Sequence, residues 1–487
     1  MYPVIDPKSF EGQGDGFGIS SPQELAELNK ALEAGLATTP GTQTGGGALR
    51  VESLDATLKI VSYLMKNIVF YNDIPKSKAY NTVEEYNLLS KYGGKGGFFI
   101  SEGGLPRTED STYTRKVQFV KFMGTTREVS HPMLLVKPAH GNVVALETKN
   151  GAMWMLRQME ESLFNANSTI VTQAFDGLKT QAIAGYADST TGGDLQPSTS
   201  NEHVIDMRGA PLTEGIFAEA SRILLDNHYF PTACYLPHSA HRDYNVGFFS
   251  KGRYPIGGAD ANETGFDSRV VKTSGGKIIL KPNVFLRIDK TAPTTAENSS
   301  CPTKPVTAAV TVGAVSTSRG FLAAEYASYT YSVTALSRNG ESDATTGNAT
   351  AVVAAAGSAE VTVTITRGAV SGNDLTTGYR VYRTRYEDGV AGTKYLIAEI
   401  ASSGGSTVFK DGNEYLPGLG EAYVGQYDET VLTLRELSPM LKFPLATVAS
   451  SIRWMQLYYN TPILFRPRGI ICIKNIGRLS VPSLGAD

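Results

Sequence analysis

Four side chains near the middle of the chain are of the types that bind zinc: His228, Cys234, His238 and His241. A thiolate and three imidazoles suit this metal. However, Cys234 stands in a short apolar run that is typical of a strand, and His238 follows Pro237 as the first residue of a helix would. We therefore interpret the four as a buried cysteine and surface histidines, and expect no metal site.

Motifs of nucleotide binding and hydrolysis are absent, since the sequence has no G-x-x-x-x-G-K-[ST], no H-E-x-x-H and no G-x-S-x-G. The glycine run Gly93–Gly97 around Lys95 lacks the strand–loop–helix context of a phosphate site, and is interpreted as a flexible loop tip. Trp154 and Trp454 are interpreted as core or interface residues. No acidic pair can be assigned to one cleft. We expect no catalytic residue, no cofactor site and no enzyme.

Composition excludes several classes of protein. The 487 residues include 45 Lys and Arg against 47 Asp and Glu, a net charge of −2 that argues against a surface built for phosphate contacts. The overall residue usage excludes a disordered chain, a coiled coil and a collagen. Three widely spaced cysteines exclude a disulfide framework and favour a reducing cytoplasm. We expect no membrane span and no secretory signal.

The first 48 residues are rich in Gly, Ser, Thr and Pro and are interrupted by one predicted helix, which Ser21 can cap and Gly35 can end. Its apolar stripe consists of Leu25, Leu28 and Leu32. Such a short helix is not stable alone in water, so this arm needs a partner surface. A second helix is expected from about residue 51 to 64.

A long two-stranded arm is predicted next. Residues 82–86 and 116–122 show partial strand alternation, and about thirty polar and glycine-rich residues separate them. A connection longer than about 15 residues is unusual inside a compact domain and is commonly functional. We interpret this segment as an arm that extends outward.

The remaining body mixes helices and strands. Val143–Asn165 is the most helical segment, a short helical stretch follows Phe175 to about Gly185, and Thr213–Asp226 is amphipathic. Ala233–Leu236 reads as a short strand. Two apolar runs near the end, 462–466 and 469–473, are expected to form a closing pair of strands.

Residues from about 292 to 420 differ in texture, being rich in Thr, Ala, Ser, Val and Gly. Alternating strands are predicted at 329–335, 360–365, 379–382 and 395–400. Short strands separated by turns predict an inserted β-sandwich. We interpret Arg380, Arg383 and Arg385 as the exposed edge and face of one strand, with an acidic neighbour as the alternative.

This order of parts resembles the major capsid proteins of tailed phages, which share the HK-type capsid fold, and in particular those of large Twort-like phages. The similar stretches are 46–50, 68–74, 175–178, 211–214, 219–220, 232–237, 423–446 and 473–476. The insertion resembles bacterial Ig-like and fibronectin type III modules.

The resemblance implies an α+β chain with an inserted all-β Ig-like sandwich. The implied parts are an N-terminal arm (1–47), a peripheral domain with a spine helix (48–65, 131–205 and 446–487), an extended loop (66–130), an axial domain (206–290 and 421–445) and the Ig-like domain (291–420).

The implied function is that of a major capsid protein, which self-assembles into the icosahedral head shell around a double-stranded DNA genome. Implied partners are other copies in hexamers and pentamers, the portal, cement or decoration proteins, and DNA contacted non-specifically. Assembly is expected in the host cytoplasm, with the Ig-like domain on the outer surface of the virion. Two alternatives remain: an encapsulin-like compartment shell, against which the outward insertion argues, and a secreted carbohydrate-active enzyme, against which the missing signal and acid pairs argue.

Overall fold

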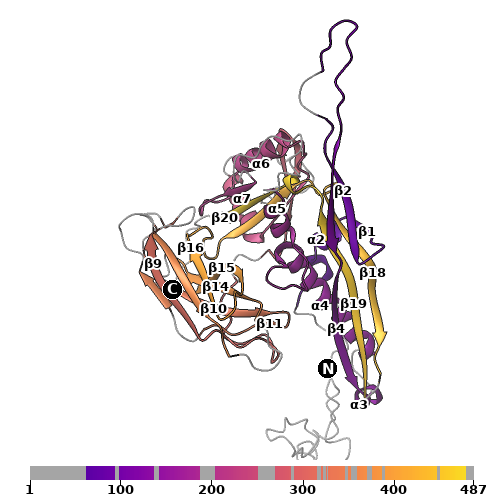
Figure 1. Ribbon diagram of the computed structural model, residues 1–487. Helices are drawn as coiled ribbons and strands as arrows, with labels where there is room; N and C mark the ends of the chain where they lie inside the picture. The colour runs from indigo at the N-terminus through magenta and orange to yellow at the C-terminus, as the bar shows by residue number, and fades with distance from the viewer. Residues whose placement is uncertain are drawn as a thin grey trace, which may run out of the picture. The chain divides into compact units, whose positions relative to one another are not determined.

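The computed structural model describes most of the chain after residue 61 (Figure 1). The described residues are 62–93, 98–136, 142–186, 203–249, 269–286, 290–314, 320–321, 325, 327–345, 349–352, 359–369, 376–386, 390–446 and 450–478. The expected helix with the stripe at Leu25, most of the one expected at 51–64, and the glycines at 94, 96 and 97 lie outside them.

Helix α4, Val143–Asn165, has the bounds that its sequence predicted. It buries Met155, Met159 and Leu163, which recur at helical spacing. The amide of Gln456 donates to the carbonyl of Thr148 at 2.7 Å and so fastens this helix to strand β19.

The other helices are short. They are η3 (Met65–Asn67), α2 (Phe70–Asp73), α3 (His131–Leu135), α5 (Leu178–Tyr186), α6 (Glu214–Asp226), α7 (His238–Phe249) and η6 (Pro467–Gly469). The predictions for α5, α6 and the start of α7 are confirmed. Within the described residues, no helix is long and apolar enough to cross a membrane.

A four-stranded sheet has the order β1-β18-β19-β4. Its strands are β1 (Lys76–Lys78), β18 (Leu432–Pro444), β19 (Ser451–Leu464) and β4 (Lys121–Ser130). Strand β1 runs parallel to β18, whereas the other neighbours are antiparallel. This sheet therefore joins the two ends of the predicted arm to the C-terminal part of the chain.

A six-stranded sheet has the order β5-β20-β17-β6-β8-β7. Its strands are β5 (Val204–Asp206), β20 (Ile470–Ile476), β17 (Gly420–Gly425), β6 (Ala233–Leu236), β8 (Gly276–Pro282) and β7 (Val270–Thr273). The expected closing pair of C-terminal strands is wrong, because residues up to Leu464 belong to the four-stranded sheet and β20 pairs with β17 and β5.

The body has one core of buried residues, in which aromatic rings from distant segments meet. Phe70 stacks on Phe164 at 4.5 Å between ring centroids and meets Tyr235 edge-on at 4.8 Å. Phe164 also stacks on Tyr423 at 5.7 Å. Such rings bury large apolar areas and add about 0.5–1.5 kcal/mol per pair, so this cluster ties α2 and α4 to the six-stranded sheet.

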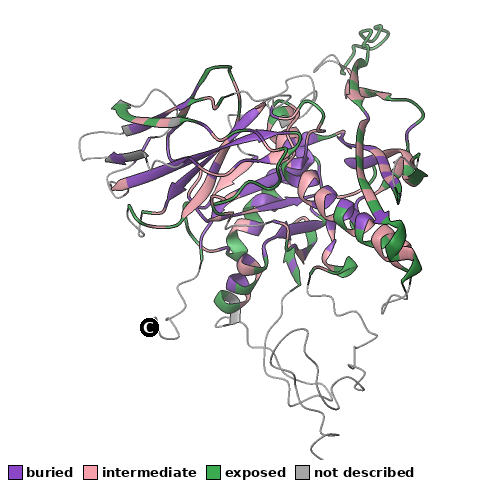
Figure 2. Ribbon diagram, turned by 90° about the horizontal axis from the view of Figure 1, so that it is seen from below, coloured by how far each residue is buried: buried purple, intermediate pink, exposed green. Residues whose placement is uncertain are grey.

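The inserted segment folds as a sandwich of two sheets, as predicted. One sheet has the order β11-β10-β14-β15, with β12 also pairing with β10, and the other has the order β16-β13-β9. The strands are β9 (Thr307–Ala314), β10 (Ser328–Ser337), β11 (Gly340–Glu341), β12 (Ala349–Val352), β13 (Ala359–Thr366), β14 (Gly378–Thr384), β15 (Lys394–Ala401) and β16 (Ser406–Asp411). A separate core, with Tyr331, Val363 and Val381 among its members, lies between the sheets. Buried residues, purple in Figure 2, follow the strands.

The expectation that Arg380 and Arg383 lie on an exposed edge is wrong. Strand β14 is an inner strand between β10 and β15, and residues on both of its faces are buried, with Arg383 contacting β16 of the other sheet. Arg383 is buried and pairs with Asp411 at 2.5 Å, and Arg380 pairs with Glu399 at 2.6 Å. The alternative interpretation, an acidic neighbour, is therefore the correct one for these two residues.

Candidate assembly surface

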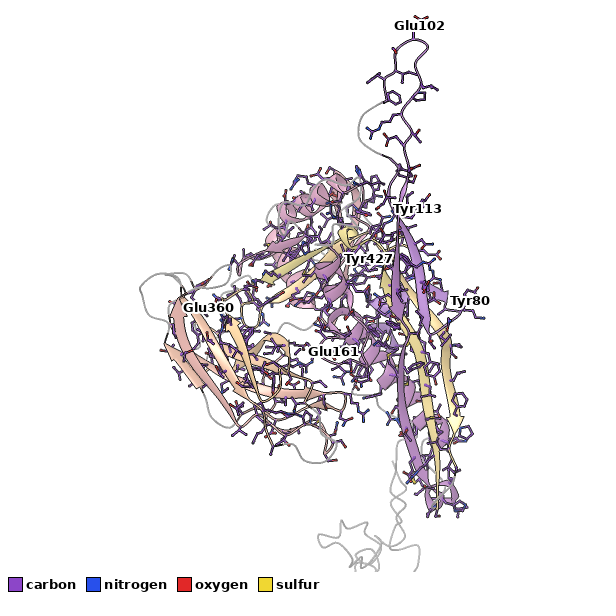
Figure 3. The ribbon with its side chains drawn as sticks, viewed as in Figure 1. Tyr80, Glu102, Tyr113, Glu161, Glu360 and Tyr427 are labelled. Carbon is purple, nitrogen blue, oxygen red and sulfur yellow. The ribbon has the colours of Figure 1, made fainter. Side chains whose placement is uncertain are left out.

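The predicted two-stranded arm is present. Strands β2 (Val83–Lys91) and β3 (Thr112–Phe119) pair antiparallel, from Val83 opposite Phe119 to Lys91 opposite Thr112. We call residues 83–119 the extended ribbon. Figure 3 places Glu102 at the far end of the connecting loop and Tyr113 nearer its base.

The two faces of the ribbon have different surroundings. On one face, Tyr86 is half-buried and meets the ring of Phe465 edge-on at 4.9 Å. The other face carries four large apolar side chains that are 41% to 69% exposed. We call these four the ribbon face: Leu89, Tyr113, Val117 and Phe119. Because neighbouring side chains in a strand point to opposite sides, these residues share one side of the ribbon.

The loop beyond the strands carries a second apolar group, which is 53% to 94% exposed. We call it the apolar tip, and it consists of Phe98, Phe99, Ile100 and Leu105. The rings of Phe98 and Phe99 meet edge-on at 5.2 Å, so they form one small cluster. Exposed apolar patches of this kind mark interaction sites. The sequence carries a signal for this tip, an apolar triplet between two glycine-rich runs, that our reasoning did not use.

The base of the ribbon is fixed to the body on both sides. On the outgoing side, the Asp73 carboxylate accepts hydrogen bonds from the Tyr235 hydroxyl at 3.1 Å and from Lys281 Nζ at 2.8 Å. On the return side, the buried residue Val120 leads directly into β4, which pairs antiparallel with β19 from Lys121 opposite Asn460. The ribbon thus leaves the body from a held base, while its far end is exposed.

The zinc-type residues of the sequence do not form a metal site in the described part of the chain. There, no group of three or more His, Cys, Asp or Glu side chains is placed to hold an ion. Cys234 is fully buried in β6, and burial raises the pKa of its thiol. His238 is the first residue of α7, and His228 has a left-handed backbone. The buried-cysteine interpretation is confirmed.

The two tryptophans differ in burial. Trp454 lies in the core, and Trp154 on α4 is partly exposed. A partly buried ion pair that the sequence did not predict joins α5 to β17, where Lys179 Nζ lies 2.5 Å from Glu421 Oε1. Burial lowers the pKa of Lys179, but the charge of Glu421 raises this pKa by more than burial lowers it, so the pair stays ionised. This pair connects two core elements.

Curated proteins of similar sequence are phage capsid proteins. The chain is 25% identical over 471 residues to the major capsid protein of Staphylococcus phage S25-3, covering 93% of this chain and 96% of that protein. It is also 25% identical over 474 residues to the major capsid protein of Staphylococcus phage K, with the same coverage. No family model matches the chain.

Solved structures of similar architecture were also found. The capsid of cyanophage P-SCSP1u is 9% identical with a TM-score of 0.43, covering 91% of this chain and 97% of that one. The encapsulin of the holo-SrpI complex from Synechococcus elongatus is 10% identical with a TM-score of 0.37, covering 88% and 95%.

Proposed function

We propose that the chain is a tailed-phage major capsid protein with the HK-type fold, located in the virion capsid, and that its copies join through the extended ribbon. The observation that carries the proposal is the pair of exposed apolar groups, the ribbon face and the apolar tip. Together they present eight large apolar side chains to water. In the shell, a neighbouring copy would cover both groups.

The physical argument rests on what a lone ribbon lacks. A two-stranded hairpin is marginally stable in water by itself and needs packing against another surface. Burying one large apolar side chain contributes about 1.5–3 kcal/mol. Each copy in a closed shell repeats its contacts with its neighbours, so a modest contribution per copy stabilises the whole assembly.

We propose the division of the chain that the resemblance implied. The parts are the N-terminal arm (1–47), the peripheral domain (48–65, 131–205 and 446–487), the extended loop (66–130), the axial domain (206–290 and 421–445) and the inserted domain (291–420). One strand departs from this division: β20 lies beside β17 in the six-stranded sheet that also holds β6, so we propose to assign residues 470–476 to the axial domain and not to the peripheral range that contains them. The sandwich would be the Ig-like module on the outer surface.

We further propose the partners of the assembled shell. Copies would form its hexamers and pentamers, and the portal and cement or decoration proteins would contact it. The packaged DNA would be contacted non-specifically, which suits a net charge of −2 because few phosphates would be neutralised. Assembly would take place in the host cytoplasm, and no catalysis is assigned to the chain.

The test replaces the apolar tip without shortening the loop. The variant Phe98→Ser, Phe99→Ser and Leu105→Ser removes three tip side chains that are at least 86% exposed. Because they touch little else in the single chain, the subunit should fold with an unchanged melting temperature. It should nevertheless fail to form shells in electron micrographs of purified particles.

The matched control changes polar residues of the same loop, Glu102→Gln with Asp110→Asn, and should assemble as the wild type does. Both positions are exposed. Shells of normal size and yield from the tip variant would contradict the proposed role of the tip.

A further inference from the structure

A buried carboxylate stands where α4 meets the segment that leads into the ribbon. Glu160 lies on α4 and has no exposed surface. Its Oε1 accepts hydrogen bonds from the backbone amides of Val69 at 3.1 Å and Phe70 at 2.7 Å, and from Asn283 Nδ2 at 2.6 Å. Its Oε2 accepts from the amide of Tyr71 at 2.7 Å. Four N–H donors therefore converge on one side chain.

A carboxylate is the side chain that this arrangement requires. It is an acceptor only, with about four lone-pair sites, whereas the amide of a glutamine would turn two donors of its own toward these N–H groups. Among the described residues, no Lys, Arg or His forms an ion pair with Glu160. Burial raises the pKa of Glu160, and the donors on Tyr71, Phe70, Asn283 and Val69 lower it without cancelling burial.

The three amides belong to the turn that opens α2, and α2 is only four residues long. Such a helix cannot fix its own position, so its contacts must do so. After α2, the carbonyl of Pro75 accepts a hydrogen bond from the amide of Leu434 in β18 at 2.8 Å, β1 then pairs with β18, and β2 of the ribbon begins at Val83. The turn held by Glu160 is thus the first fixed point on the outgoing side of the ribbon.

The fourth donor connects a different part of the chain. Asn283 follows β8 and precedes the segment that leads into the sandwich. Its backbone N–H donates to the carbonyl of Leu236 at 2.9 Å. Asn283 Oδ1 also accepts from the amide of Phe285 at 2.8 Å. One carboxylate thereby joins the spine helix, the turn before the ribbon and the six-stranded sheet.

We propose that Glu160 is a positioning residue for the extended ribbon, setting the direction in which the ribbon leaves the body by fixing the turn at residues 69–71 to α4. The role of this direction in shell assembly rests on the proposed function above, whereas the positioning itself does not.

The test measures the position of the ribbon in the full-length subunit. Spin labels are attached at Glu102→Cys in the loop and at Asp226→Cys at the end of α6, with Cys301→Ser removing the one partly exposed native cysteine among the described residues. The distance distribution between the labels is recorded with wild-type Glu160 and with Glu160→Gln. The matched control is Glu161→Gln, the next residue of the helix, which contacts Lys290 at 3.8 Å instead.

The expected result is a broadened or shifted distribution for Glu160→Gln and an unchanged one for Glu161→Gln, with both variants folded by circular dichroism. A purely structural role would lower the melting temperature of Glu160→Gln but leave the distribution as in the wild type, and that result overturns the proposal. A wild-type distribution as broad as that of the variant overturns it too.

A second variant covers the case in which Glu160→Gln does not fold. Asn283→Ala removes one of the four donors and should change the distribution in the same direction, to a smaller extent. No change in a folded Asn283→Ala overturns the proposal. Electron microscopy of the same proteins separates the two claims, because normal shells from a variant with a displaced ribbon would contradict the proposed assembly role and not the positioning.

Discussion

The ion pair inside the sandwich gives a stability prediction that can be worked out from contacts. Arg383 is 1% exposed and its Nη1 lies 2.5 Å from Asp411 Oδ2, whose side chain is 4% exposed. Arg383 Nη2 also donates to Asn413 Oδ1 at 2.5 Å, and the Tyr331 hydroxyl donates to Asp411 Oδ2 at 2.7 Å. Arg383→Met keeps much of the buried length of the side chain and removes the charge.

The expected loss of unfolding free energy in Arg383→Met follows from the hydrogen bonds that Asp411 retains without the arginine. In the variant, the Asp411 carboxylate would still accept hydrogen bonds from the Tyr331 hydroxyl and from the backbone amide of Asn413 at 2.8 Å, but it would have no cation beside it. Three hydrogen bonds from the guanidinium are lost, to Asp411, to Asn413 and, at 3.5 Å, to the carbonyl of Tyr415. Their contributions are not additive, and breaking one partner of a buried pair costs about 3–5 kcal/mol. The variant should therefore lose about 3–5 kcal/mol of unfolding free energy.

The assay is denaturation of the full-length chain, with hydrogen exchange of peptides from β13 and β16 identifying the transition of the sandwich. Lys304→Met is the matched control, because its pair with Asp343 at 2.9 Å has both side chains substantially exposed, at 39% and 33%, and such surface pairs contribute about 0–1 kcal/mol. If Arg383→Met stayed within 1 kcal/mol of the control, as an order-of-magnitude criterion, the reasoning about the buried pair would be refuted.

Three further substitutions give predictions: one concerns the pH dependence of stability, and two glycine substitutions are expected to change stability in opposite directions. Burial raises the pKa of Glu341, but the charges of Arg380 and Lys290 lower it to below its ordinary value of 4.5. The ionised Glu341 therefore stabilises the fold above pH 4.5, and this contribution is lost as the pH falls through the lower pKa of the folded protein. Glu341→Gln removes the contribution, so the melting temperature of this variant should fall less steeply on the acid side. A Cβ at Gly177 would lie 2.8 Å from backbone atoms, whereas one at Gly247 would meet open space. Gly177→Ala should therefore cost about 1–3 kcal/mol in urea denaturation, and Gly247→Ala should stabilise by about 0.4–1 kcal/mol.

Local patterns in the sequence were sufficient to predict several elements. The spacing of Trp154, Leu156, Met159 and Leu163 identified α4, and period-two alternation identified β10, β13, β14 and β15 of the sandwich. The long polar connection predicted the ribbon. These features depend on neighbours within one element, so no knowledge of distant contacts was needed.

Features that depend on distant partners were not predicted. Strand β1 has the sequence Lys-Ser-Lys, which carries no apolar signal, and it forms by pairing with β18 more than 350 residues later. The burial of Arg383 follows from its contact with Asp411 of β16 in the other sheet, and the sequence of β14 alone does not reveal which strand covers its face. Glu160 resembles any helix glutamate until residues 69–71 are placed beside it.

The apolar tip shows a different limit. Phe98, Phe99 and Ile100 are visible in the sequence, but a short apolar triplet between glycines is equally compatible with a buried strand. Their exposure becomes meaningful when the structure shows that they lie beyond the paired strands. The absence of a motif for enzymatic chemistry, by contrast, could be judged from the sequence alone.

The central claim is most directly tested by a cryo-electron-microscopy reconstruction of particles purified from cells that produce the full-length chain with its phage. The account predicts closed shells in which the ribbon face and the apolar tip of each copy, including Tyr113 and Phe99, are covered by a neighbouring copy. Shells in which these side chains stay in solvent, with the copies joined elsewhere, would contradict it.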